Sequence, residues 1–172
     1  MSHLDRTAAI LDIVETAANS GQLPGPTQSF LAQYLAVVLY SEMEERVAEI
    51  VKGHLECFTH EAVANFVTSS MGDLIRRVPK SDIAKLAERF GEAFKTRFNG
   101  SVEEHKVTFY SNVISARHEI GHRRGSNISL SEVKKGHEAA NHILDTLANC
   151  LAANEPASDI ASGLSNSDVT LG

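Results

Sequence analysis

Residues 114–133 read ISARHEIGHRRGSNISLSEV, and they contain the end of one predicted helix and the start of the next. Gly121 and Gly125 are typical of a helix C-terminus, where glycine tolerates the backbone conformation that ends a helix. Ser-Leu-Ser-Glu at 129–132 then matches the capping box, in which serine and glutamate side chains satisfy free N–H groups of the backbone. The stretch therefore predicts a helix over 102–121, or as far as Gly125, and a final helix over about 130–153.

Upstream of this stretch, helix signals recur and strand signals are almost absent. Ser-Val-Glu-Glu at 101–104 is a second capping-box match, and it marks the expected start of the helix over 102–121. Thr27 follows an LPGP turn and is expected to cap a long helix that reaches about Cys57. The other predicted helices cover 3–18, 59–79 with a break near Gly72, and 81–98. The chain is thus predicted to be all-α, a helical bundle of about five to six helices with two long central helices.

The 172 residues are expected to form one domain over residues 1–154, with a polar, disordered tail over 155–172. A formal net charge of −6 gives no reason to expect nucleic-acid binding over the whole surface, so any such contact needs a local basic patch. The N-terminus lacks a secretory signal and no apolar run approaches the length of a membrane helix. These features predict a cytoplasmic protein that does not contact a membrane.

One dense group of cationic side chains stands out in this acidic chain: Arg117, His118, His122, Arg123 and Arg124. Planar guanidinium groups match the oxygens of a phosphate, and imidazole can transfer a proton near neutral pH. The group is therefore a candidate phosphate site. The alternative interpretation is a solvated basic helix C-terminus, which the helix dipole favours.

Arg117 falls within the apolar arc of its predicted helix, so it needs a partner if it is buried. Glu44 belongs to a stripe at helical spacing in the long helix, which is predicted to face inward, whereas Glu42 and Glu45 are expected to be solvated. The members of this stripe are Phe30, Tyr34, Val37, Ser41, Glu44, Ala48 and Val51. The expected contact between Glu44 and Arg117 is either purely structural or orients a functional arginine, and both interpretations stay open.

His118 and His122 also form an HExxH pattern, which places two imidazoles on one helical face with Glu119 as a general base for zinc chemistry. The extended version of the pattern needs a third histidine at position 128, where the chain has isoleucine, although a glutamate from the next helix, such as Glu138, could still be the third ligand. Arginines follow the second histidine, and no strand is predicted for substrate pairing. A zinc peptidase is therefore the less favoured interpretation, and no metal and no cofactor are expected.

The competing motif is Arg-x4-His, from Arg117 to His122. In a straight helix these two side chains point about 140° apart. Their convergence on one phosphate therefore requires the helix to loosen around Gly121, which glycine permits.

From Gln28 to Leu151, about three-quarters of the chain, the layout resembles the HEPN superfamily and within it the RiboL-PSP-type HEPN domains. The resemblance rests on LAQYLAVVLYSEMEERVAEIV, KLAERFGEAF and ISARHEIGHRRGSNISLSEV. HEPN motifs consist of arginine, a polar residue, three further residues and histidine, as in residues 117–122. Glu44 stands where such proteins often carry a glutamate in the second helix. Many members have Ala-His-Gly where this chain has Gly-His-Arg.

The resemblance implies a metal-independent ribonuclease of toxin or defence type that is active as a homodimer, with an antitoxin or another protein as a further partner. In this hypothesis Arg117 holds the RNA phosphate and His122 transfers the proton. His118 and Glu44 support them, and Arg123 and Arg124 bind the RNA backbone. The alternative is a non-catalytic HEPN module that binds RNA or another protein.

Overall fold

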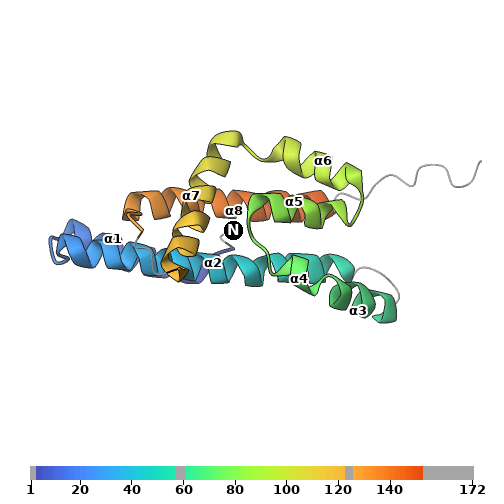
Figure 1. Cartoon of the computed structure of the whole chain (residues 1–172), viewed down its shortest axis with the longest axis horizontal. Coiled ribbons are helices and arrows are strands. Elements are labelled where there is room, and N and C mark those ends of the chain that lie inside the picture. Colours follow the sequence, from blue (N-terminus) through green and yellow to red (C-terminus); the bar gives the residue numbers. More distant parts are fainter. Residues whose placement is uncertain (1–2, 57–60, 123–125, 153–172) are drawn as a thin grey trace, which may run out of the picture.

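A computed structural model describes residues 3–56, 61–122 and 126–152 of the chain (Figure 1). The described residues form eight α-helices and no strand, which confirms the predicted all-α class. The helices are α1 (Asp5–Asn19), α2 (Gly25–Leu55), α3 (Glu61–Ser70), α4 (Gly72–Ile75), α5 (Lys80–Glu88), α6 (Glu92–Ser101), α7 (Glu104–Gly121) and α8 (Leu130–Ala152). The predicted tail over 155–172 lies outside the described residues, so the domain boundary stays a prediction.

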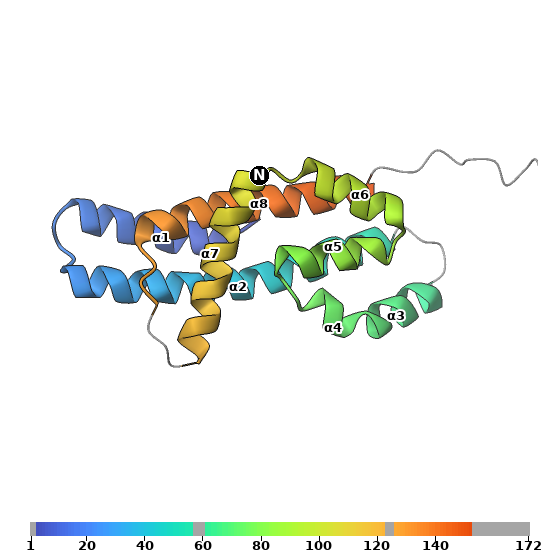
Figure 2. The same cartoon turned by 45° about the horizontal axis from the view of Figure 1, so that its top comes forward.

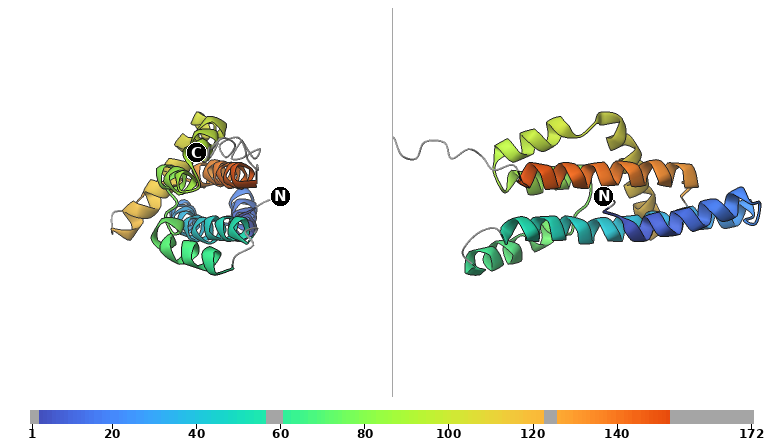
Figure 3. Two further views of the ribbon diagram at one scale, coloured as in Figure 1. Left: turned by 90° about the vertical axis from the view of Figure 1, so that its right-hand side faces the viewer. Right: turned by 180° about the vertical axis from the view of Figure 1, so that it is seen from behind.

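The two longest helices, α2 and α8, pack against each other and form the centre of the bundle. Helix α1 folds back along α2 and also contacts α8, whereas α5 and α6 pack together beside α8. Helix α7 crosses both α2 and α8 at a steep angle (Figure 2). Seen from the end of the bundle, the C-terminal part of α7 extends outward past its neighbours (Figure 3). None of the described helices combines the length and the apolar character needed to cross a bilayer.

Two more helices are present than expected because two predicted helices are each divided. Met71 separates α3 from α4, close to the predicted break near Gly72. The expected continuous helix over 81–98 instead breaks between α5 and α6, where Gly91 has a φ of 131°. This left-handed conformation is strained for any residue with a Cβ atom, so glycine at position 91 fixes the turn between the two helices.

The predicted inward stripe of α2 was wrong for all of its members except Val51, which is buried. Phe30, Tyr34 and Val37 expose 68%, 50% and 39% of their surface, and Glu44 is only partly buried. The buried face lies beside that stripe on the helix and consists of Ala32, Leu35, Ala36, Leu39, Met43, Val47, Val51 and Leu55. It is built largely from small and aliphatic residues, which let α8 approach closely, whereas the larger aromatic side chains face outward.

Glu42, expected to be solvated, is 1% exposed and belongs to the buried face. Its carboxylate accepts hydrogen bonds from the backbone N–H groups of Arg6 and Thr7, both at 2.9 Å, and from the Thr7 hydroxyl at 2.8 Å. These groups belong to the first turn of α1, where free N–H groups and the helix dipole both favour a negative charge. The burial of Glu42 is therefore satisfied, and it ties α1 to α2.

The two predicted capping boxes have different outcomes. Ser129 and Glu132 form the expected reciprocal bonds: the Ser129 N–H donates to the Glu132 carboxylate at 2.9 Å, and the Glu132 N–H donates to the Ser129 hydroxyl at 3.2 Å. The box at Ser101 was wrong, because Ser101 is the last residue of α6 and α7 begins only at Glu104. Val102 between them has an extended backbone and a nearly buried side chain, which fixes the link between the helices.

Helix α7 lies close against α8 because Gly136 of α8 has no side chain. A Cβ atom at position 136 would lie only 2.2 Å from Cγ2 of Val113 in α7. On the same face of α7, the buried Tyr110 donates a hydrogen bond of 2.5 Å from its hydroxyl to the carbonyl oxygen of Val78. Burial raises the pKa of Tyr110 well above its usual value, which keeps this donor protonated. The bond fixes the segment before α5 beside α7.

Candidate functional site

The candidate site lies at the C-terminal end of α7, which stays helical through its last turn. The His122 N–H donates to the carbonyl oxygens of His118 and Glu119, at 3.2 and 3.1 Å. Gly121 is the last helical residue, and it is not among the described glycines with positive φ. The expected loosening of the helix around Gly121 was therefore wrong.

Because α7 remains regular, Arg117 and His122 have separate partners. The Arg117 guanidinium lies over the ring of Tyr40 in α2, with its central carbon 4.3 Å from the ring centroid. The exposed His122 ring instead meets the ring of His118 edge-on, with the centroids 4.4 Å apart. The structure thus brings His118 and His122 together as their spacing of four residues predicts. Among the described residues, no hydrogen bond or ring contact joins His122 to Arg117.

The expected buried contact between Glu44 and Arg117 is not an ion pair in the part of the chain that the structure describes. Arg117 stacks on Tyr40, one turn before Glu44 in α2. Glu44 is half-buried, and this burial raises the pKa of its carboxyl, whereas the nearby charges of Arg117 and Arg76 act in the opposite direction. The Arg117 charge therefore acts on the Glu44 carboxyl without a hydrogen bond between them.

Three further cations near this site were missed by the sequence analysis: Arg76, Arg77 and Lys80. Burial raises the pKa of Tyr40, with the Glu44 charge adding to the effect, while the charges of Arg117 and Arg77 lower it. Arg77 and Arg117 thus lie near the same phenol from two distant parts of the sequence. The run RRVPK at 76–80 was the available signal in the sequence. Its position beside α7 depends on tertiary contacts such as the hydrogen bond from Tyr110 to Val78, which the sequence does not reveal.

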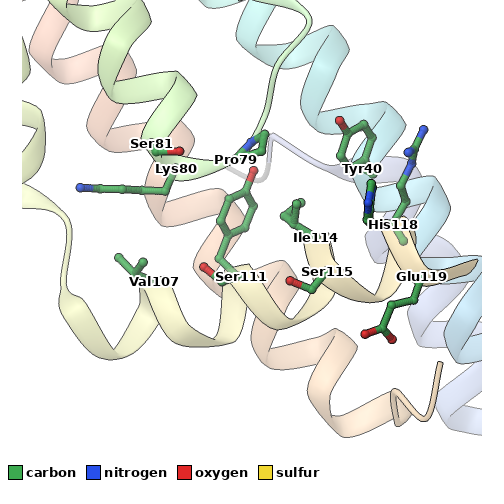
Figure 4. A pocket seen from close by; sticks show the side chains of 12 residues that line it. Tyr40, Pro79, Lys80, Ser81, Val107, Ser111, Ile114, Ser115, His118 and Glu119 are labelled. Atoms are coloured by element: carbon green, nitrogen blue, oxygen red, sulfur yellow. The ribbon is translucent and has the colours of Figure 1, made fainter. Parts of the chain in front are cut away.

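A pocket of about 750 Å³ lies between α7, Tyr40 of α2 and the start of α5. Arg117, His118 and Glu119 line it, together with apolar side chains and serine hydroxyls, whereas His122 and Glu44 are not among its lining residues. In Figure 4, Tyr40 and His118 lie at one end of the pocket and Lys80 at the other. The candidate phosphate site therefore opens into a much larger hollow.

The zinc interpretation of His118 and His122 requires a third ligand close to them. No group of three or more His, Cys, Asp or Glu side chains that could hold a metal ion is found within residues 3–56, 61–122 and 126–152. Glu138 of α8 consequently does not complete a site with the two histidines. Arg123 and Arg124, expected to bind the RNA backbone, lie outside the described residues, so their role stays a prediction.

The family model described as RiboL-PSP-HEPN matches residues 3–153 of the chain. The protein belongs to this HEPN family, as the motif at 117–122 and the all-α bundle indicated. Membership is consistent with a function in RNA cleavage or another RNA-related function. No curated protein and no solved structure matches the chain.

Proposed function

We propose that the protein is a metal-independent endoribonuclease. The observation that carries this proposal is the environment of Arg117. Its guanidinium is held by an aromatic ring instead of a carboxylate, lines a large pocket, and is followed in the sequence by the first of two touching imidazoles. Many other cations of the described residues form ion pairs, including Arg6, Arg46, Lys52, Lys85, Lys95, Lys106 and Lys134. Arg117 is therefore available to an anionic ligand.

The proposed reaction needs only groups of the protein and the RNA. The 2′-hydroxyl oxygen of a ribose attacks the adjacent phosphorus, a P–O2′ bond forms, and the P–O5′ bond breaks. The 2′-hydroxyl proton leaves to a base, and the departing 5′-oxygen receives a proton, so that a cyclic phosphate and a free 5′-hydroxyl remain. His122 transfers one of these protons, a contribution worth roughly 10²–10⁴-fold. Arg117 stabilises the negative charge on the phosphate oxygens, and His118 orients the His122 ring.

We further propose that two copies of the chain form the active unit. Within one chain Arg117 and His122 contact different residues. In a dimer with the two motifs facing each other across a two-fold axis, one phosphate could contact the arginine of one copy and the histidine of the other. The exposed stripe of Phe30, Tyr34 and Val37 on α2 offers an apolar surface for this contact. Gln33 of the same segment donates to the carbonyl oxygen of Ser126 at 2.9 Å, which links the stripe to the connection after α7.

The direct test is cleavage of single-stranded RNA in EDTA by the wild-type protein and by His122→Ala. We expect wild-type cleavage to survive chelation and the variant to lose at least about 100-fold in rate. Because His122 is exposed, its replacement is expected to change the free energy of unfolding by no more than about 0.5 kcal/mol. His105→Ala, another exposed histidine at the start of α7, is the matched control. Cleavage that requires added zinc, or that persists in His122→Ala, would contradict the proposal.

The divergence of Arg117 and His122 also favours a second candidate, a HEPN module that binds RNA without cutting it. Such a protein would use Arg117 and the neighbouring cations for phosphate contacts, with no proton transfer by His122. RNA that is bound tightly but recovered intact after hours with the wild-type dimer would support this function. In that case His122→Ala would leave the affinity for RNA nearly unchanged, whereas Arg117→Ala would lower it.

A further inference from the structure

The pocket beside Arg117 is larger than one phosphate needs. Its volume is about 750 Å³, and its wall on α7 extends from Val107 to Glu119, a distance of about 18 Å along the helix axis. Apolar side chains, among them Val107, Ile114 and Pro79, alternate there with the hydroxyls of Ser111 and Ser115. A flat, mostly apolar group with polar edges, such as a nucleobase, has the chemistry that this lining would accept.

Each end of the pocket has a cationic side chain. Arg117, which lies over Tyr40, lines one end together with His118 and the exposed carboxylate of Glu119. Lys80 lies at the opposite end, beside Val107 (Figure 4). The Lys80 ammonium donates to the side-chain oxygen of Asn99 and lies 5.7 Å from the ring centroid of Phe98. No carboxylate pairs with it in the described ranges. A half-buried lysine whose ammonium contacts only neutral groups has no carboxylate to compete with an anionic ligand.

Lys85, on the same helix, shows the contrast. Its ammonium lies 3.2 Å from the Asp82 carboxylate, it is exposed, and it does not line the pocket. In the described residues the chain thus neutralises one lysine of α5 and leaves the other without a carboxylate partner, at the edge of a hollow that Arg117 also lines. A ligand with two negative charges, separated by a group that fits the apolar middle, can contact both cations. A nucleotide within a nucleic-acid strand has this sequence of groups.

We propose that the pocket holds the nucleotide next to the scissile phosphate of single-stranded RNA, an inference that rests on the ribonuclease function proposed above. The base lies against Ile114 and Val107, and the hydroxyls of Ser111 and Ser115 bond to its edge or to the ribose. Lys80 binds the phosphate that follows this nucleotide. Because a base in a duplex stays paired and stacked, only an unpaired strand can place one in the pocket.

The test measures the binding of a short fluorescent single-stranded oligoribonucleotide over a range of salt concentrations, in the His122→Ala background so that the probe stays intact. Loss of one phosphate contact lowers the slope of log affinity against log salt by about 0.7 for a single strand. We therefore expect Lys80→Gln to lower the slope by about this amount and to weaken binding about tenfold. Lys85→Gln, the matched control, should keep the affinity within twofold and the slope unchanged.

A second pair of variants tests the middle of the pocket. Ser111→Leu fills it from the exposed face of α7, and we expect it to weaken binding of the single strand at least tenfold without lowering the melting temperature. Asn112→Leu, the adjacent exposed position outside the lining, is the control and should bind as before. A fully paired duplex of the same sequence should bind more weakly than the single strand and should be insensitive to Ser111→Leu.

The outcomes separate this inference from the proposed function. If the wild-type protein cleaves RNA but Lys80→Gln and Ser111→Leu bind the probe like their controls, the pocket proposal is wrong and the ribonuclease proposal stands. If both variants lose binding as expected but the wild-type protein cuts no RNA, the pocket is an RNA-binding site and the ribonuclease proposal is wrong. Absence of any RNA binding would overturn both.

Discussion

Arg117 stacks on an aromatic ring, whereas the sequence suggested an acidic partner. The kind of partner determines how much the free energy of unfolding changes when Arg117 is replaced. An arginine in a buried ion pair leaves an uncompensated charge behind when it is removed, at a cost of about 3–5 kcal/mol. A half-exposed guanidinium stacked on a phenol ring contributes only about 0.5–1 kcal/mol. The geometry over Tyr40 is therefore compatible with a side chain that is kept for binding an anion instead of for stability.

The first prediction at this scale concerns Arg117→Ala and Arg117→Lys. We expect the alanine variant to lose no more than about 1 kcal/mol in the free energy of unfolding and at least about 100-fold in RNA cleavage. Lysine keeps the charge but not the planar group that stacks on Tyr40 and matches two phosphate oxygens, so it should restore only part of the activity. Urea denaturation and cleavage rates measure the two effects. A loss of several kcal/mol would show that Arg117 is a structural residue.

At the scale of single helices, Glu132 gives a prediction of pH dependence. The Ser129 N–H and hydroxyl both donate to its carboxylate, and these bonds lower the pKa of Glu132 in the folded protein. A lowered folded pKa means that the carboxylate stabilises the fold above the ordinary glutamate pKa and that this contribution is lost as pH falls through the folded value. Ser129→Ala is expected to cost about 0.5–2 kcal/mol at neutral pH.

The measurement is thermal unfolding of the wild-type protein and Ser129→Ala between neutral and acidic pH. The difference in melting temperature between them should shrink as pH falls below the ordinary glutamate value, because protonated Glu132 accepts the cap bonds more weakly than the carboxylate does. Ser131→Ala, an exposed position in the same turn, is the control. A difference that stays constant with pH would show that the cap owes nothing to the charge of Glu132.

The packing of α7 on α8 gives a second prediction at the scale of elements. Gly136→Ala places a methyl group where the Val113 side chain already lies, so we expect a loss of about 1–3 kcal/mol from overpacking. Gly53→Ala in α2 is the control, because among the described residues no atom outside the α2 backbone lies within 4 Å of the added Cβ, and alanine favours a helix. It should be neutral or stabilising. Equal stability of the two variants would contradict the close approach of α7 and α8.

The helices that the sequence predicted best are those with local signals at their ends. The start of α8 follows from Ser129 and Glu132 alone, and its observed span closely matches the predicted one. The rotation of α2 could not be predicted in the same way, because two apolar stripes lie side by side on it. Choosing between them depends on what packs against the helix, and the α1 N–H groups that satisfy Glu42 are thirty-five residues away in the sequence.

At the scale of the whole molecule, only part of the candidate site could be predicted, because some of its residues are adjacent in the sequence and others come together only in the folded chain. Arg117, His118 and His122 stand together in the sequence, so their common location followed from the motif. Lys80, Arg77 and Tyr40 reach the site only through tertiary contacts, above all the hydrogen bond from Tyr110 to Val78. The same contacts gather positive charge around one pocket in a chain whose formal net charge is −6. A local basic patch of this kind is what an acidic protein needs in order to bind RNA.

The last prediction concerns assembly. Phe30 exposes 68% of its surface, and Tyr34 and Val37 continue the same stripe along α2. If this stripe is the surface on which two copies meet, Phe30→Glu buries an unpaired charge in the contact and should convert a dimer to a monomer at micromolar concentration. Because Phe30 is exposed in the single chain, Phe30→Glu should not destabilise the monomer, and monomeric variant and monomeric wild-type protein should unfold at nearly the same temperature. Sedimentation equilibrium measures the molecular mass.

Phe66→Glu on α3 provides the control, since Phe66 is equally exposed at 72% but belongs to a different helix face. It should leave both the molecular mass and RNA cleavage unchanged. If the active unit is the proposed dimer, cleavage by Phe30→Glu should fall together with the dimer fraction, because Arg117 and His122 contact different residues within one chain. A wild-type protein that is monomeric and fully active would show instead that Arg117 and His122 of a single chain come together when RNA binds.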